Sequence, residues 1–100
     1  MSQQAEHVYN DPARLARLEV LVGQLPPNGH VNVSLRNGTV YDGIVCARPS
    51  MEIFRDQEGR EGFNALLRLG RAGMSEWSRY IWLDEISRIE HMDSIMGSES

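Results

Sequence analysis

The chain has 100 residues, of which 41% are hydrophobic and 24% are charged, a composition that excludes a globally disordered protein and fits one small domain. Its formal net charge of −4 argues against a protein that coats nucleic acid non-specifically. No apolar run approaches the roughly 18–20 residues of a membrane span, and no signal peptide is visible. The single cysteine, Cys46, excludes an internal disulfide. We therefore expect a cytoplasmic protein without a membrane partner.

Residues 1–10 are polar and predict a flexible N-terminus, and residues 11–25 predict one amphipathic helix. Asp11 is suited to cap this helix, and Pro12 is suited to its first position, where a missing N–H has no consequence. Apolar residues recur at spacings of three and four along one face, namely Leu15, Leu18, Val22 and Leu25. We expect the helix to end before Pro26, because proline cannot donate the hydrogen bond that would continue it.

The strongest pattern in the chain is a β-hairpin, with strands at residues 30–36 and 39–47. Apolar and polar residues alternate along the first strand, so its apolar residues share one face: Val31, Val33 and Leu35. Asn37-Gly38 predicts a type I′ turn, which needs positive φ at both central positions. Gly43, inside the second strand, indicates a sharp bend of the kind that a small barrel needs.

Four further segments predict strands, at residues 51–55, 63–69, 80–83 and 87–92. A polar turn is expected at residues 57–62 and a flexible loop at residues 70–76. Six β segments exceed the five of a minimal barrel, so either residues 63–69 continue a bent strand or the chain carries an extra hairpin. The expected organisation is one domain at residues 11–93, with its barrel at 30–92, and a disordered tail at 94–100.

A set of residues at fixed spacing runs through the hairpin and beyond it: Val31, Val33, Leu35, Gly38, Tyr41, Gly43, Ile44 and Met51. This set resembles the first motif of the Sm-like family, which includes eukaryotic and archaeal Sm proteins and the bacterial RNA chaperone Hfq. The segment 80–89 is similar to the family's second motif in its apolar spacing. The chain is also similar to a divergent, uncharacterised bacterial family with an Sm-like barrel. The resemblance implies a mainly β fold with one N-terminal helix and a strongly bent, five-stranded antiparallel barrel of the Sm-like or SH3-like kind.

The chain departs from the family where Sm proteins that bind uridine typically carry an acidic residue, a stacking aromatic or histidine, and an asparagine. The residues in that register are Arg48, Ser50 and Glu52. The missing aromatic removes base stacking of roughly 1–3 kcal/mol per base. The second motif lacks the Arg-Gly of Sm proteins and the Lys-His of Hfq, and has Trp82-Leu83 instead. The resemblance therefore implies the scaffold of the family, whereas its RNA site does not carry over residue by residue.

Two non-catalytic functions remain open for such a barrel. The first is RNA association, which the family resemblance favours and whose best residues are Arg48, Arg55, Arg68 and Arg71. The second is a protein-interaction or assembly module without RNA binding, which the acidic charge and the missing stacking residue favour. Its candidate residues are Tyr80 and Trp82, which share the outward face of a strand if Ile81 and Leu83 fill the barrel. Because Sm-like rings resemble assemblies joined along their last two strands, we also expect self-association through strand edges.

No residue pattern indicates a catalytic, metal or cofactor site. Cys46 has no basic neighbour in its predicted strand, and we expect it to be a small buried hydrophobe. No metal-ligand spacing connects the three histidines, His7, His30 and His91. Asp84 and Glu85 adjoin each other in a turn, where their side chains diverge instead of sharing a proton. We therefore predict a protein that is not an enzyme and uses no cofactor.

Overall fold

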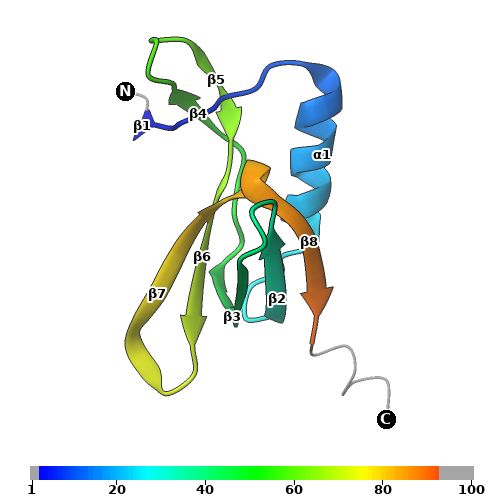
Figure 1. Cartoon of the computed structure of the whole chain (residues 1–100), viewed down its shortest axis with the longest axis vertical. Helices are drawn as coiled ribbons and strands as arrows, with labels where there is room; N and C mark the ends of the chain where they lie inside the picture. The colour runs from blue at the N-terminus through cyan, green and yellow to red at the C-terminus, as the bar shows by residue number, and fades with distance from the viewer. Residues whose placement is uncertain (1–2, 93–100) are drawn as a thin grey trace.

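The computed structural model describes residues 3–92, and the expected disordered tail at 94–100 lies outside this part of the chain. Figure 1 shows a helix beside a β-rich body. The helical elements are α1 (Pro12–Gly23) and the short 3₁₀ helix η1 (Leu83–Glu85). The strands are β1 (Gln3–Gln4), β2 (His30–Leu35), β3 (Val40–Ala47), β4 (Glu52–Arg55), β5 (Glu61–Asn64), β6 (Leu66–Arg71), β7 (Met74–Trp82) and β8 (Ile86–His91). The fold is mainly β, as the sequence predicts.

The predicted hairpin is the centre of a five-stranded antiparallel sheet with the strand order β7-β6-β3-β2-β8. Val31 and Val33 of β2 are fully buried, which confirms the face predicted from their alternation. Opposite Val31 lies Gly43 of β3, where a Cβ would come within 2.9 Å of the Gly70 carbonyl oxygen. Gly43 is therefore required because β3 and β6 approach each other too closely for a side chain.

The prediction of a barrel closed by five strands is wrong. The outer strands of the sheet are β7 and β8, and they do not pair with each other in the described residues. Figure 1 shows them diverging from η1 on opposite sides of β2 and β3. Strand β7 pairs with β6 from Trp82 to Met74, and this long hairpin leads it away from β8. The sheet contains register shifts, at which bulges bend strands, and it remains open in the described residues.

The extra hairpin that the sequence leaves as one alternative is present. Strands β4 and β5 pair antiparallel, and β1 adds in parallel to β4 to make a separate three-stranded sheet. The predicted strand at residues 63–69 divides at Ala65, with β5 in one sheet and β6 in the other. Asn64 makes this buried break possible, because its side-chain oxygen accepts a hydrogen bond of 2.8 Å from the Ala65 N–H.

The turn between β2 and β3 differs from the type I′ turn that Asn37-Gly38 predicts. Gly38 has a φ of 93°, whereas the φ of Asn37 is not positive. The Leu35 N–H donates to the Thr39 carbonyl at 2.8 Å, and the Gly38 N–H donates to the Leu35 carbonyl at 3.0 Å. These bonds define a three-residue loop with a left-handed glycine at its end, which is the next commonest hairpin geometry.

Helix α1 begins as predicted and ends two residues earlier than expected. The Asp11 carboxylate accepts a hydrogen bond of 3.1 Å from the Arg14 N–H, and Pro12 occupies the first turn. Leu18, Leu21 and Leu25 are buried against the five-stranded sheet, where they pack with the buried residues of β2, β3, β6, β7, η1 and β8. The helix therefore covers one end of the core.

Residues 3–10, which the sequence assigns to a flexible N-terminus, pack against the second sheet. The Ala5 N–H donates to the Arg55 carbonyl at 3.0 Å, and Ala5 is buried. Tyr9 exchanges two backbone hydrogen bonds with Phe63 of β5, at 2.9 and 2.8 Å. Figure 1 shows this segment crossing from β1 to α1 over the β4–β5 hairpin.

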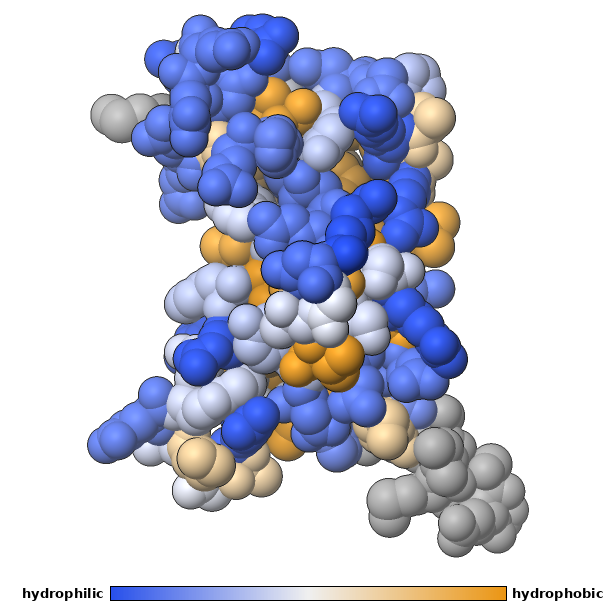
Figure 2. Space-filling model, in the orientation of Figure 1, coloured by the Kyte–Doolittle hydropathy of each residue, from blue (hydrophilic) through white to orange (hydrophobic). Residues whose placement is uncertain are grey.

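The surface is mostly polar on the face that Figure 2 shows, with small separate apolar patches. Among the described residues, no helix has both the length and the apolar character that a membrane crossing would require.

Candidate nucleic-acid interface

The β6–β7 hairpin places arginine and aromatic side chains next to each other at one end of the sheet. Its register sets Arg68 opposite Tyr80 and Leu69 opposite Arg79, and a register shift follows at Gly70. We call the following residues the arginine–aromatic surface: Arg68, Arg71, Trp77, Arg79 and Tyr80. Leu67, Leu69 and Ile81 of the same strands are buried and anchor the hairpin to the core. Trp77 is half-buried against this core, whereas the other four residues of the surface are exposed.

Three guanidinium groups of the surface lie against two of its aromatic rings. The Arg71 guanidinium carbon lies 3.9 Å from the centroid of the Trp77 ring, and that of Arg79 lies 5.3 Å from the same centroid. The Arg68 guanidinium carbon is 6.0 Å from the Tyr80 centroid. These distances are those of cation–π contacts, which hold the planar guanidinium groups beside the rings.

The three guanidinium groups are not neutralised by neighbouring acids. In residues 3–92, the ion pairs of arginine involve Arg55, Arg60 and Arg88. Arg71 donates to the Asp42 carbonyl at 3.2 Å and Arg79 to the Ser78 carbonyl at 3.1 Å, and both side chains keep further donors. Tyr80 is 63% exposed, so one face of its ring is open to solvent. The surface therefore combines accessible positive charge with an accessible aromatic ring.

Residues 2–92 match the family described as a domain of unknown function, DUF3247. The chain belongs to this family. The crystal structure of XC5848 from Xanthomonas campestris, described as adopting a novel variant of Sm-like motif, is 35% identical in sequence to this chain. It matches with a TM-score of 0.84, over 92% of this chain and 99% of that one. No curated protein matches the chain.

The resemblance to the Sm-like family that the sequence motif indicates is thus confirmed at the level of the fold. The DUF3247 chain has the one helix and the mainly β body of that resemblance, with an additional three-stranded sheet. Arg48, Ser50 and Glu52 lie between β3 and the start of β4, and Ser50 donates to the Glu52 carboxylate at 3.0 Å. This loop holds no aromatic residue, so base stacking has to come from another part of the molecule.

The structure brings together two of the four arginines that the sequence assigns to RNA. Arg68 and Arg71 belong to the arginine–aromatic surface. Arg48 lies in the loop after β3, and Arg55 of β4 forms an ion pair with Glu61 at 2.9 Å in the other sheet. Of these four arginines, only Arg68 and Arg71 therefore lie on the β6–β7 hairpin.

Tyr80 and Trp82 do not share one environment, although the sequence treats them as an outward pair. Ile81 and Leu83 are buried as expected, and Tyr80 is exposed. The Trp82 ring instead packs edge-on against Phe54 of β4, with the ring centroids 5.0 Å apart and the planes at 84°. Trp82 therefore connects the two sheets of the same chain.

Trp77 and Arg79 are the functional candidates that the sequence reasoning misses. The glycines of Gly70-Arg71-Ala72-Gly73 predict a loop at residues 70–76, but β6 extends to Arg71 and β7 begins at Met74. Gly73, with a φ of 75°, allows the tight turn that keeps both strands long. The alternation Trp77-Ser78-Arg79-Tyr80 is the local signal that could have extended the strand toward the turn.

The residues that the sequence excludes from chemistry have structural roles. Cys46 is exposed, not buried as predicted, because Val45 faces the core and the next residue of β3 points outward. Its Sγ covers Gly70, where a Cβ would lie 2.9 Å away. The Asp84 carboxylate in η1 accepts hydrogen bonds from Tyr9 and Asn64 and so connects η1 to two other segments. The described residues hold no cluster of three or more potential metal ligands.

Proposed function

We propose that this Sm-like DUF3247 protein is a non-catalytic RNA-associated protein that binds single-stranded RNA through the arginine–aromatic surface. The observation that carries the proposal is the exposed Tyr80 ring, which lies beside Arg68 on a hairpin that also holds the Arg71–Trp77–Arg79 cluster. The resemblance to Sm proteins and Hfq favours the same class of partner. The protein would therefore use an Sm-like scaffold but present RNA with a different surface.

Aromatic rings and guanidinium planes are the groups on which unpaired bases stack. Single-stranded RNA exposes both base faces and phosphates, and each base has a π face, so stacking tolerates different sequences. The Tyr80 ring offers such a platform, and Arg68 beside it can contact the adjacent phosphate. The Tyr80 ring would supply the stacking group that is missing because Ser50 stands where Sm proteins carry an aromatic residue or histidine.

Charge sets the expected strength and salt dependence of binding. The whole chain has a formal net charge of −4, so attraction to RNA has to arise locally, from Arg68, Arg71 and Arg79. Neutralising about three phosphates of a single strand predicts a slope of roughly −2 for the logarithm of the association constant against the logarithm of salt concentration. Binding should therefore be modest in affinity and visibly weakened by salt.

Fluorescence anisotropy with labelled uridine-rich and adenine-rich RNA, titrated at two salt concentrations, tests the proposal. We expect binding to both RNAs and a loss of affinity at the higher salt concentration. Arg68→Gln and Tyr80→Ala should each raise the Kd by about fivefold or more, because each removes a phosphate contact or a stacking platform worth roughly 1–3 kcal/mol. Arg55→Gln is the matched control, because Arg55 is already paired with Glu61.

Two results would contradict this function. One is an absence of binding at micromolar protein that persists when the salt concentration is lowered. The other is an equal loss of affinity in Arg55→Gln and Arg68→Gln, which would indicate a diffuse charge effect and no defined surface.

Self-association is the second candidate function, and the open sheet favours it. Strands β7 and β8 each have one edge without a partner strand in the described residues. Unpaired backbone groups along such edges are templates for β-augmentation, in which a second chain continues the sheet. This mode of assembly would not require Trp82, because that ring packs against Phe54.

A further inference from the structure

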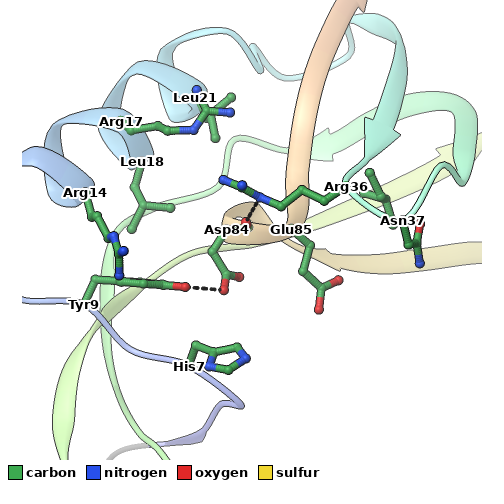
Figure 3. Close-up of a pocket in the computed structure, with 11 residues that line it drawn as sticks. His7, Tyr9, Arg14, Arg17, Leu18, Leu21, Arg36, Asn37, Asp84 and Glu85 are labelled. Carbon is green, nitrogen blue, oxygen red and sulfur yellow. Dashed lines mark hydrogen bonds between the residues drawn. The ribbon is translucent and has the colours of Figure 1, made fainter.

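A pocket of about 540 Å³ lies between α1, the segment before it, the β2–β3 turn and η1. Its apolar lining comes from Leu18, Leu21 and Leu35, and polar side chains form the rest. Figure 3 shows Arg14 and Arg17 extending from α1, while Arg36 reaches toward α1 from the β2–β3 turn. The pocket shares no residue with the arginine–aromatic surface.

The three arginines of this pocket lack a carboxylate partner. Within residues 3–92, no Asp or Glu oxygen lies within 4.0 Å of the guanidinium nitrogens of Arg14, Arg17 or Arg36. Arg36 donates from Nε to the Asp84 carbonyl at 3.0 Å, and Arg17 donates from one Nη to the Ile86 carbonyl at 3.1 Å. Arg14 lies over the Tyr9 ring, 5.4 Å from its centroid. Each guanidinium is thus positioned by one contact and keeps further donors.

The two acids of the pocket are directed elsewhere. The Asp84 carboxylate accepts hydrogen bonds from the Tyr9 hydroxyl at 2.9 Å and from the Asn64 amide at 3.2 Å, and Figure 3 shows the former. Burial, with Asp84 and Glu6 nearby, raises the pKa of Glu85, against an opposing effect of His7. Neither carboxylate forms an ion pair with the arginines within residues 3–92, and the pocket lining holds three arginines against these two acids.

We propose that this pocket binds a small phosphate ester, with the phosphate held by Arg14, Arg17 and Arg36 and the organic part against the three leucines. A guanidinium presents its donors as a planar fork that matches two phosphate oxygens, and three forks suit a group with three free oxygens better than a carboxylate with two. The volume lies within the range of roughly 300–1,000 Å³ that small-molecule sites occupy. The site is independent of the RNA proposal, because it uses different residues.

Isothermal titration of the full chain with inorganic phosphate, adenosine 5′-monophosphate and adenosine tests the inference. We expect adenosine 5′-monophosphate to bind more tightly than inorganic phosphate, since it also contacts the apolar lining, and adenosine not to bind. Arg14→Gln and Arg36→Gln should each weaken binding by about tenfold, because each removes charge-assisted hydrogen bonds. Binding of inorganic phosphate alone at equal strength would also support the phosphate site, but would place the organic part outside the pocket.

Glu85→Gln should change the phosphate affinity in the opposite direction. It removes a negative charge from the pocket without touching the Glu85 carbonyl, which accepts from the Arg36 N–H at 2.9 Å, and it should tighten phosphate binding severalfold. Arg60→Gln, in the β4–β5 turn and paired with Asp56 and Glu58, is the matched control and should leave binding unchanged. The inference is overturned if neither phosphate compound binds at millimolar concentration, if adenosine binds as tightly as its monophosphate, or if Glu85→Gln and Arg36→Gln leave the affinity unaltered.

Discussion

Asp84 accepts hydrogen bonds from two residues that are distant in the sequence, Tyr9 at 2.9 Å and Asn64 at 3.2 Å. The Asn64 amide also donates to the His7 carbonyl at 2.9 Å, so the N-terminal segment, the end of β5 and η1 meet in one network. Asn64 is 1% exposed, and a buried amide stabilises a fold only when its polar atoms are paired. This network explains why a polar N-terminal segment takes a fixed place on the domain.

The Tyr9 hydroxyl predicts a pH-dependent stability. Burial and the neighbouring Asp84 carboxylate raise the pKa of Tyr9 from 10.0 to about 12. Because the folded chain holds this proton more tightly than the unfolded chain does, the resulting stabilisation is complete below the unfolded pKa and is lost as the pH rises toward the folded pKa. Tyr9→Phe should lower the free energy of unfolding at neutral pH by about 1 kcal/mol.

Urea unfolding of both proteins across the alkaline range measures this effect. The stability of the unaltered chain should fall between pH 10 and 12, and that of Tyr9→Phe should fall less steeply. Equal slopes in the two proteins would contradict the role assigned to the Tyr9–Asp84 hydrogen bond.

At the scale of elements, the β4–β5 hairpin is the main addition to the five-stranded sheet. It is joined to that sheet through the continuous chain at Ala65, where β5 ends and β6 begins, and through the edge-on packing of Phe54 on Trp82. Phe54 is buried, so this contact lies in the interior between the two sheets. The hairpin and β1 are thus held by packing and not by continuation of the larger sheet.

Trp82→Ala should therefore destabilise the domain by about 2–4 kcal/mol, because it leaves a cavity beside Phe54. Tyr80→Ala, two residues earlier on the same strand, should cost less than about 1 kcal/mol, since its ring is exposed. Denaturant unfolding of the two variants compares them directly. Hydrogen exchange should show the β4 and β5 amides losing protection in Trp82→Ala first, and equal destabilisation by both variants would contradict this account.

At the scale of the whole molecule, groups of arginines lie at two places on a chain whose net charge is negative. The net charge is −4, yet three arginines lie beside aromatic rings on the β6–β7 hairpin, Arg68 at Tyr80 and Arg71 and Arg79 at Trp77. A second set of three arginines faces the pocket beside α1. Because surface potentials act over about 10 Å at moderate ionic strength, such clusters attract anions even when the total charge does not.

The open edges of β7 and β8 predict assembly at high concentration. Light scattering on a sizing column should give a mass above that of one chain, increasing with protein concentration, if these edges pair between copies. The same mass is expected for Tyr80→Phe, which keeps the β7 backbone and the exposed ring. A strict monomer at every concentration would contradict edge-to-edge assembly.

Three of the five residues of the arginine–aromatic surface were candidates from the sequence, Arg68 and Arg71 for RNA and Tyr80 for a protein interface. Arg68 and Arg71 stand out because arginines concentrate in the middle of the chain, while Trp77 is obscured by the glycines that precede it. Two of the cation–π contacts, Arg68–Tyr80 and Arg71–Trp77, join β6 to β7 and depend on the register between these strands. That register is a property of strand pairing, and no local pattern specifies it.

The sequence by itself determined the elements whose causes are local. Asp11 and Pro12 start α1, alternation orients Val31 and Val33, and the Sm-like motif identifies the scaffold. Only the tertiary structure decided that the sheet stays open, that the β4–β5 hairpin forms a second sheet, and that residues 3–10 are fixed. Capping and alternation act between residues a few positions apart, whereas the bonds of Asp84 and the Phe54–Trp82 contact join segments that only folding brings together.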